Sequence, residues 1–198
     1  MVRICTSLFA FTTLLGASAT SQALQPQRGW LMEVSYLNSD LYLKTPIIFT
    51  DRYGQQSREH NDLPQVGTGF GYVFQNGLIT ELKFNTGSLE LLRDIVGLDA
   101  YQLTEIHVAT AYDFYFAARF SVGPELRLTK AKLQAEEGEF LNPGPEEKFS
   151  LEDYTWTWGA KAKWRISHSF TMTLSHYRAR YDFGDSQTTG LEFQWHWN

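Results

Sequence analysis

The sequence has very little cysteine, and no long apolar run after its first two dozen residues. A polytopic helical membrane protein needs several stretches of about 20 apolar residues, so this class is excluded. A net charge of −5 also argues against a nucleic-acid-binding protein, which is usually basic. Six Trp, ten Tyr and fourteen Phe carry more apolar surface than a disordered chain does. The chain is therefore expected to fold, and the positions of its aromatic residues need an explanation.

The first 23 residues have the organisation of a secretory signal peptide. Arg3 supplies a positive charge, a short apolar stretch follows, and small residues end the segment. We predict cleavage after Ala23, with Ala19 as the alternative site. The remaining residues 24–198 are long enough for one domain. Because the only cysteine, Cys5, leaves with the signal, thiol catalysis and Cys-based metal sites are excluded, and we expect neither a metal nor another cofactor.

Apolar and polar residues alternate over most of the remaining chain. The clearest example is 154–166, where aromatic or small apolar residues alternate with Thr, Gly, Lys and Arg. Strict period two is typical of a β-strand with one apolar and one polar face. Asn76-Gly77 separates two more alternating segments, 65–75 and 78–85, and is a strong signal for a β-hairpin. Five further segments alternate in the same way: 30–36, 104–112, 114–129, 170–175 and 190–197.

The eight predicted strands are joined by connections of two kinds. Short turns are predicted at Asn76-Gly77, near Asp113 and at 167–169, and longer connections at about 44–64, 87–101, 134–150 and 182–187. Gly123-Pro124 suggests a β-bulge within a strand. Short turns at one end and long loops at the other, joining an even number of antiparallel strands, are typical of an outer-membrane barrel. The sequence therefore predicts an all-β fold, an eight-stranded antiparallel transmembrane up-and-down β-barrel.

The orientation of the two strand faces separates a membrane barrel from a soluble lipocalin-like or sandwich fold. The interior of an eight-stranded barrel holds only side chains, and the aromatic residues of this chain would overfill it. The apolar face is therefore predicted to meet lipid. Trp156 and Trp164 would lie about 20 Å apart along the membrane normal, for a rise of ~3.3 Å per residue and a tilt of ~40°. The predicted aromatic belts comprise Trp30, Tyr154, Trp156, Trp158, Trp164, Trp195 and Trp197.

The polar strand face would fill the lumen with charged side chains. Charges removed from water must pair with one another, and acids and bases on this face are nearly balanced. A structural ion-pair network that plugs the lumen is the main prediction, and a gated ion pathway is the alternative. Lys161, Lys163 and Arg165 form the only local excess of positive charge, which would attract anions from the periplasmic side. The predicted network consists of Glu33, Glu81, Lys83, Glu105, His107, Arg119, Glu125, Arg127, Lys161, Lys163, Arg165, Glu192 and His196.

With these features, the chain resembles the small OmpA/OmpX-type outer-membrane β-barrel family of Gram-negative bacteria. The resemblance rests on the strand pattern and on the terminal strand, in which Leu191, Phe193, Trp195 and Trp197 alternate. It implies a location in the bacterial outer membrane and contact with its lipids and lipopolysaccharide. In that family the last strand ends in an aromatic residue that the barrel-assembly machinery recognises. Here Asn198 follows the last aromatic residue.

The loops suggest a function at the cell surface. Residues 134–153 carry seven Asp and Glu against the single basic residue Lys148, which predicts a solvated extracellular loop. The long alternating stretch 114–133 exceeds the roughly 9 to 11 residues that cross a membrane, so we expect its hairpin to project beyond the lipid. A projecting sheet edge can pair with strands of a partner. The sequence therefore favours a structural or adhesive role toward host or cell-surface ligands.

Catalysis is not expected from this sequence. Outer-membrane lipid A deacylases, palmitoyltransferases, phospholipases and omptin proteases combine His with Ser or Asp near the outer rim, and no motif of these families is recognisable here. Ser175 and His176 are adjacent in a predicted strand and would point to opposite faces, which argues against a direct Ser/His pair. A lipid A-modifying enzyme and a narrow ion or solute channel remain the alternatives to a surface-interaction protein.

Overall fold

The computed structural model describes residues 28–45, 49–50, 56–57, 62–88, 100–136 and 148–197. The predicted signal segment with its cleavage sites, the middle of the acidic loop and Asn198 lie outside the described residues. The described residues form strands and turns, and none of them belongs to a helix that is long and apolar enough to cross a membrane.

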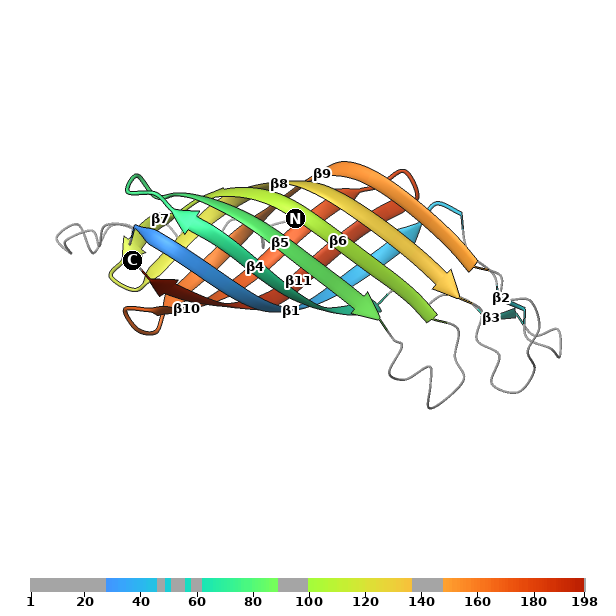
Figure 1. Ribbon diagram of the computed structural model, residues 1–198, viewed down its shortest axis with the longest axis horizontal. Coiled ribbons are helices and arrows are strands. Elements are labelled where there is room, and N and C mark those ends of the chain that lie inside the picture. The colour runs from blue at the N-terminus through green and yellow to red at the C-terminus, as the bar shows by residue number, and fades with distance from the viewer. Residues whose placement is uncertain are drawn as a thin grey trace, which may run out of the picture.

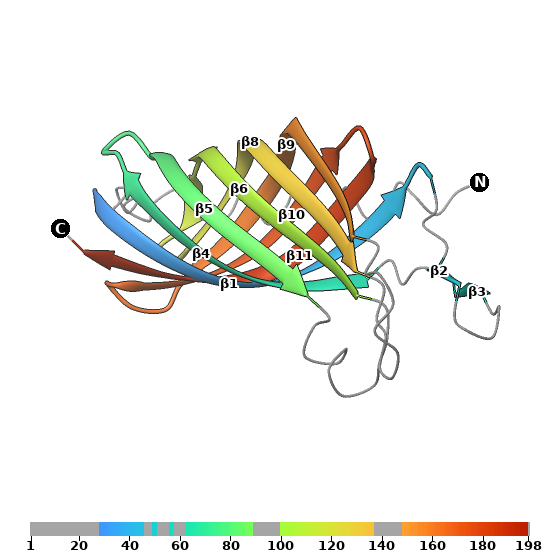
Figure 2. The same ribbon diagram turned by 45° about the vertical axis from the view of Figure 1, so that its right-hand side comes forward.

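Eight long antiparallel strands close into a barrel (Figures 1 and 2). The sheet order is β6-β5-β4-β1-β11-β10-β9-β8, and a further pairing between β6 and β8 closes the circle. This confirms the predicted eight-stranded up-and-down barrel. The long strands are β1 (Gly29–Leu43), β4 (Asp62–Val73), β5 (Leu78–Ser88), β6 (Ala100–Tyr112), β8 (Phe120–Glu136), β9 (Lys148–Arg165), β10 (Phe170–Arg180) and β11 (Gly184–Trp197). The described residues add the short strands β2 (Phe49–Thr50), β3 (Gln56–Ser57) and β7 (Phe114–Ala117).

The register of the strands determines how steeply they tilt. Paired residues lead once around the barrel, from Trp30 through Tyr72, Thr80, Thr110, Leu126, Trp158, Arg178 and Gln187 to Asp40. One circuit from Trp30 to Asp40 therefore advances β1 by ten residues, which is the shear of the barrel. Shear and strand number together set tilt and diameter. An eight-stranded barrel with this stagger tilts its strands by about 40° and leaves room only for side chains inside.

Three short turns lie at the end of the barrel where β1 starts and β11 stops, which we call the short-turn end. The first follows β4, where Gly77 has a φ of 86° that other residues rarely adopt. The Asn76 side chain accepts a hydrogen bond of 3.1 Å from the Leu78 N–H, and the Gly77 N–H donates to the Phe74 carbonyl at 3.0 Å. These contacts explain why Asn-Gly forms the predicted hairpin turn.

The turn that follows β6 is not where the sequence placed it. Asp113 does not form the turn: it is buried at the end of β6, and β7 then continues to pair with β8. The chain reverses at Ala118 and Arg119, between β7 and β8. The predicted stretch 114–133 is therefore split by a turn, and β8 begins only at Phe120.

The predicted bulge at Gly123-Pro124 is also wrong. Gly123 pairs with Lys161 and Pro124 with Ala160 in an unbroken register between β8 and β9. The irregularity lies instead between Tyr115 and Ala117, next to the turn. Pro124 has no N–H to donate. On the side of β8 away from β9, it faces the junction between β6 and β7, where it is paired with neither strand.

The connection between β10 and β11 is much shorter than the predicted 182–187. It comprises Tyr181, Asp182 and Phe183, and backbone hydrogen bonds of 2.7 and 3.2 Å join Tyr181 and Gly184. Asp185 already pairs with Arg180. The alternation of apolar and polar residues disappears at the start of β11 because both of its faces are polar there, so the pattern does not mark the strand.

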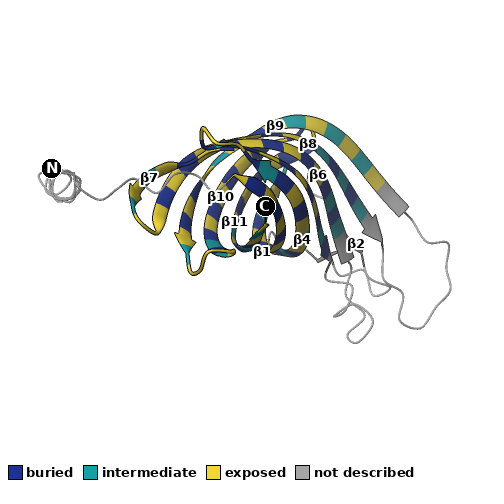
Figure 3. Cartoon of the chain, turned by 60° about the vertical axis from the view of Figure 1, so that its left-hand side comes forward, coloured by how far each residue is buried: buried dark blue, intermediate teal, exposed yellow. Residues whose placement is uncertain are grey.

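Along each barrel strand, buried and exposed residues alternate, visible as dark blue and yellow bands in Figure 3. The outer face carries large apolar side chains such as Leu82, Val108 and Leu174, each more than half exposed. The inner face is mostly polar and charged. A water-soluble protein rarely exposes a continuous apolar surface of this kind, whereas a barrel that spans a membrane requires it.

Candidate functional site

A network of charged side chains occupies the centre of the barrel. Lys161 on β9 places its Nζ 3.0 Å from carboxylate oxygens of Glu81, Glu125 and Glu192, and 3.8 Å from Glu33. Lys83 on β5 lies 2.5 Å from Glu33, 3.2 Å from Glu192 and 3.6 Å from Glu81. All of these side chains are buried. Each ammonium group is therefore surrounded by carboxylates from several strands, and the network cross-links the barrel wall.

Arg127 on β8 extends the network to one side. Its Nε donates to Glu125 at 2.9 Å, and its guanidinium lies 3.6 Å from Glu192. The guanidinium also stacks on the ring of Tyr177, 3.4 Å from the ring centroid, and the Tyr177 hydroxyl donates to Glu192. The central network thus holds three cations and four carboxylates, and the excess of negative charge is met by neutral donors such as Tyr177.

A second polar layer lies around His107 on β6. The two ring nitrogens of His107 lie 2.9 Å from Asn85 Nδ2 and 2.8 Å from Thr129 Oγ1. The ring is 3.8 Å from Glu105, which accepts a hydrogen bond from the Tyr181 hydroxyl. Both ring nitrogens of His107 are therefore engaged by neighbouring side chains, which leaves no open position for a metal.

At the short-turn end the network becomes sparse. Lys163 pairs with Asp113 at 3.0 Å, and Arg165 and His196 are only partly buried. These groups line a cavity of about 20 Å³, which holds little more than one water molecule. Arg119 is a correction to the predicted network: it is exposed in the turn between β7 and β8. The register shift beside this turn breaks the alternation that had placed Arg119 inside.

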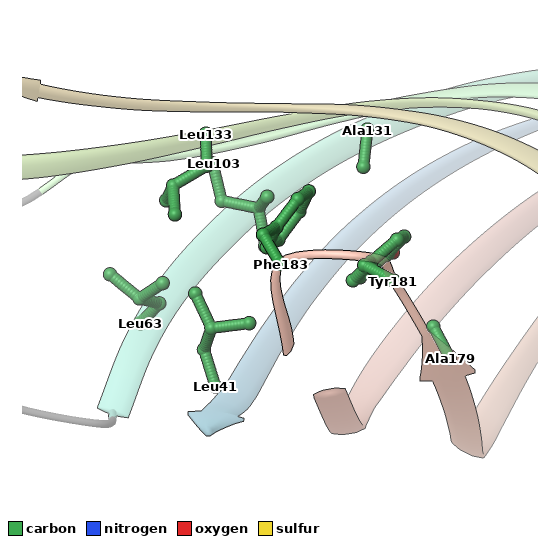
Figure 4. Close-up of a cluster of buried hydrophobic side chains, with 8 residues drawn as sticks. All are labelled: Leu41, Leu63, Leu103, Ala131, Leu133, Ala179, Tyr181 and Phe183. Atoms are coloured by element: carbon green, nitrogen blue, oxygen red, sulfur yellow. The ribbon is translucent and has the colours of Figure 1, made fainter. Parts of the chain in front are cut away.

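The interior at the opposite end, which we call the loop end, is apolar (Figure 4). Strands β1, β4, β6, β8 and β10 each contribute a buried side chain, and the Tyr181 and Phe183 rings stack with centroids 4.8 Å apart. This apolar plug consists of Leu41, Leu63, Leu103, Ala131, Leu133, Ala179, Tyr181 and Phe183. It closes the lumen beyond the charged network, so two different seals lie one after the other along the barrel axis.

Sequence reasoning missed the apolar plug and several inward polar residues. If the predicted strand 170–175 is extended with the same alternation of inward and outward positions, Tyr177, Ala179 and Tyr181 point into the barrel. The signal weakens there because the outward positions of β10 become His176, Arg178 and Arg180, so neither face is plainly apolar. Asn85 and Gln194 lie on the predicted polar face but were not included in the network, and Gln65 and Asp113 are further inward polar residues.

All residues of the predicted aromatic belts point outward and are exposed. Trp30, Trp164, Trp195 and Trp197 lie near the short-turn end, where Trp30 stacks on Phe70 with ring centroids 5.1 Å apart. Tyr154, Trp156 and Trp158 lie nearer the loop end and have the largest exposed fractions of the set, 66%, 62% and 60%. Large amphipathic rings in two bands are suited to the two interfaces of a membrane.

The β8–β9 hairpin extends beyond the rest of the barrel. These strands have 17 and 18 residues and stay paired as far as Glu136 and Lys148. In contrast, β10 pairs with β9 only up to Arg178 and Trp158. Residues 148–157 therefore form an edge with which no other described strand pairs.

Backbone hydrogen bonds show which residues face this open edge. The Arg165 N–H donates to Arg119 on the β8 side, and the Ile166 N–H donates to Phe170 on the β10 side. Because the direction alternates along a strand, even-numbered residues of β9 face the open side. Ser150 and Glu152 thus present backbone donors and acceptors there, whereas the Tyr154 N–H already donates to Asp153 Oδ1 at 2.7 Å. The part of the edge nearest the end of β10 is covered by two hydrogen bonds of 2.7 Å. Asp153 Oδ2 accepts one from the Asp182 N–H, and the Thr155 hydroxyl donates the other to the Arg180 carbonyl.

The candidate catalytic pair does not assemble. Ser175 is buried on the inner face and donates to the Gly190 carbonyl at 3.3 Å, whereas His176 is exposed on the outer face, 2.8 Å from Thr189 Oγ1. Within the part of the chain that the structure describes, no three or more His, Cys, Asp or Glu side chains are arranged to hold a metal ion.

Known proteins resemble this chain in structure only. No family model and no curated protein matches the sequence. Ail, the attachment invasion locus protein of Yersinia pestis, solved with the heparin analogue sucrose octasulfate, matches with a TM-score of 0.58 and 12% identity over 86% of this chain and 99% of Ail. Neisserial surface protein A matches with a TM-score of 0.59 and 10% identity over 85% of this chain and 97% of that protein. The N-terminal barrel of Pseudomonas aeruginosa OprF matches with a TM-score of 0.51 and 12% identity over 85% of this chain and 100% of that domain.

At these identities the similarity concerns the fold alone. The chain has the fold of the small outer-membrane β-barrels, with a closed antiparallel barrel of eight strands. The predicted resemblance to barrels of the OmpA/OmpX type is confirmed at the level of the fold.

Proposed function

We propose that this chain is a bacterial outer-membrane protein with a sealed lumen that binds a partner at the cell surface through its projecting β8–β9 hairpin. Export would remove residues 1–23, and the barrel-assembly machinery would recognise the C-terminal strand β11. The observation that carries the proposal is the combination of a closed interior with an open strand edge at the loop end.

The exterior of the barrel supports the membrane location. Its outward side chains are apolar between two bands of aromatic residues, as lipid contact requires. The short turns and both barrel termini lie at one end, which in outer-membrane barrels faces the periplasm. The loop end would then lie outside the cell, in contact with lipopolysaccharide and with ligands in the surroundings.

The closed interior supports a role other than transport. Lys161 and Lys83 are held by carboxylates from several strands, and the apolar plug offers no partner to a hydrated ion. A solute would have to break both seals to cross. Binding at the surface needs neither of these changes.

The open edge of β9 supplies a mechanism for binding. An extended segment of a partner can add to a free strand edge by main-chain hydrogen bonds, and side chains on alternate positions then set specificity. Ser150 and Glu152 offer these main-chain groups. Ail is by its name an attachment protein, and it shares the fold, which agrees with this kind of role.

Proline substitution on the open side tests the proposal. S150P/E152P removes two N–H donors that face the open edge, while the ladder with β8 depends on the odd-numbered residues and is kept. S150A/E152A is the matched control, because it removes the same side chains and retains both N–H groups. Bacteria that display each variant are compared with bacteria that lack the protein, by adherence to epithelial monolayers and by settling in suspension.

We expect wild-type cells to adhere or aggregate, the proline variant to lose about tenfold of this binding, and the alanine variant to retain it. Migration in unheated detergent gels verifies that each variant is folded. No difference between wild-type cells and cells without the protein in either assay would contradict the surface-binding role. Equal binding by both variants would contradict the edge as the binding element.

A further inference from the structure

The outer face of β8, β9 and β10 carries a group of basic residues near the loop end. Lys130 and Lys132 lie on β8 and Arg178 and Arg180 on β10, and all four point outward. Between them on β9 stand Tyr154, paired with Lys130, and Trp158, paired with Arg178. We call the four cations the basic face.

The basic face lies at the depth of lipid headgroups. On β8 the outward residue before Lys130 is Leu128, and on β10 the apolar outward residues end at Leu174, two outward positions before Arg178. The exposed aromatic belt of β9 is at the same level. Tyr and Trp prefer the interface between hydrocarbon and water, so the cations stand just above the hydrocarbon.

The opposite side of the barrel has the opposite charge at this level. Outward residues of β1 and β4 there include Asp40 and Asp62, which are paired across the two strands. The outer rim is therefore basic on one side and acidic on the other. Carboxylates also border the basic face: Glu152 on β9 lies 3.1 Å from Lys130 Nζ, and Asp185 on β11 is the cross-strand partner of Arg180.

We infer that the basic face binds the phosphate groups of phosphorylated lipids in the outer leaflet. Guanidinium groups such as Arg178 and Arg180 match phosphate oxygens in pairs, and Lys130, 5.4 Å from the Tyr154 ring centroid, adds a flexible charge. Headgroup depth selects a lipid over a soluble polyanion, because acyl chains can cover Trp156 and Trp158 while the phosphates meet the cations. Lipid phosphates would gather on this side of the barrel and be repelled from the acidic side. The inference rests on the proposed membrane location.

Two variants and two lipids test it. K130Q/K132Q/R178Q/R180Q removes the basic face, and D40N/D62N is the control on the acidic side. Each protein is inserted into phosphatidylcholine vesicles containing either bisphosphorylated lipid A or its dephosphorylated form. Heat-modifiable gel migration reports insertion, and native mass spectrometry after extraction reports the lipid that stays bound. A water-soluble sulfated sugar is added in parallel as a competitor.

Wild type and the aspartate variant should retain the phosphorylated lipid in preference to the dephosphorylated one. A basic residue near a charged membrane surface strengthens binding about fivefold, so loss of four should weaken retention by about a hundredfold or more. Equal retention of both lipids by wild type, or unchanged preference without the basic face, would overturn the inference. Displacement of the lipid by the soluble sugar would overturn the choice of a lipid ligand. Failure of wild type to insert would instead contradict the membrane location.

Discussion

At the scale of single residues, Lys161 has the most demanding position in the barrel. Its Nζ lies within 4 Å of four glutamates, and without it Lys83 and Arg127 would face all four carboxylates. Removing one partner of a buried ion pair leaves an uncompensated charge and costs about 3–5 kcal/mol. We therefore expect K161M to lower the free energy of unfolding by about this amount, measured by urea titration of the barrel in lipid vesicles.

A charge-balanced variant separates loss of charge from loss of packing. Glu125 contacts Lys161 through Oε2 and Arg127 through Oε1, so K161M/E125Q removes one cation and one anion and keeps an acceptor for Arg127. This double variant should recover more than half of the stability that K161M loses. If it is no more stable than K161M, the cost does not arise from the unpaired carboxylate.

A pair of carboxyl groups on the outer face at the loop end makes stability depend on pH. The hydrogen bond with the Asp62 side chain, together with partial burial, raises the pKa of Asp40 above its usual value of 3.8. The folded state therefore holds this proton to a higher pH than the unfolded chain does. Protonation of Asp40 therefore stabilises the folded state fully below about pH 3.8, and this stabilisation is lost as the pH rises through the folded-state pKa of Asp40.

Replacing Asp62 should remove most of this dependence. In D62N the side chain at 62 keeps its shape and an acceptor but loses its charge, so protonation of Asp40 is no longer favoured by its neighbour. Melting temperatures of wild type and D62N, measured across acid pH in detergent, should differ most at the neutral end, where D62N is the more stable. Parallel curves would contradict a coupled pair, because the other acids are common to both proteins.

At the scale of strands, alternation predicted the fold wherever a strand separates lipid from the lumen. The segments 154–166 and 65–75 were found this way, because one side of each strand must be apolar and the other polar. The same rule fails where that contrast ends. Above the lipid, β11 begins at Gly184 with two polar faces, and beside the turn at Ala118 a register shift moved Arg119 out of the lumen.

The candidate site was predictable in part for the same reason. Strand parity alone places Lys161, Lys83 and Glu33 on the inner face, but it carries no information on which strand lies across the lumen. The contacts of Lys161 with Glu81 and Glu192 depend on the shear of ten and on closure between β6 and β8. The open edge of β9 likewise follows from the shortness of β10, which the sequence pattern does not show.

The apolar plug makes a prediction for one strand. Leu133 on β8 is fully buried in the plug, while Leu128 on the same strand points outward. Truncation of a packed leucine costs about 2–5 kcal/mol because a cavity remains. We expect L133A to lower the free energy of unfolding in vesicles by this amount. L128A should cost less because lipid chains fill the vacated space, and equal losses would contradict a tightly packed plug.

At the scale of the whole molecule, the barrel reverses the arrangement of a soluble protein. A network of charges lies inside, where strands from all sides share it, and most of the described aromatic residues lie outside. This explains how a chain with so many aromatic residues can have a slightly hydrophilic mean hydropathy. The inner charges stabilise the closed barrel, and the loop end is left for contacts with the surroundings.

Two seals in series should make the barrel electrically silent. The charged network around Lys161 and the apolar plug each close the lumen, and the cavity at the short-turn end has a volume of only about 20 Å³. Purified protein in planar lipid bilayers should give no discrete conductance steps. The variant L41A/L103A/L133A/F183A, which removes most of the plug, should also stay silent, because an ion would still have to separate Lys161 from its carboxylates. Steps from wild type would contradict the sealed lumen and favour a narrow channel, and steps from the variant alone would identify the apolar plug as the only effective seal.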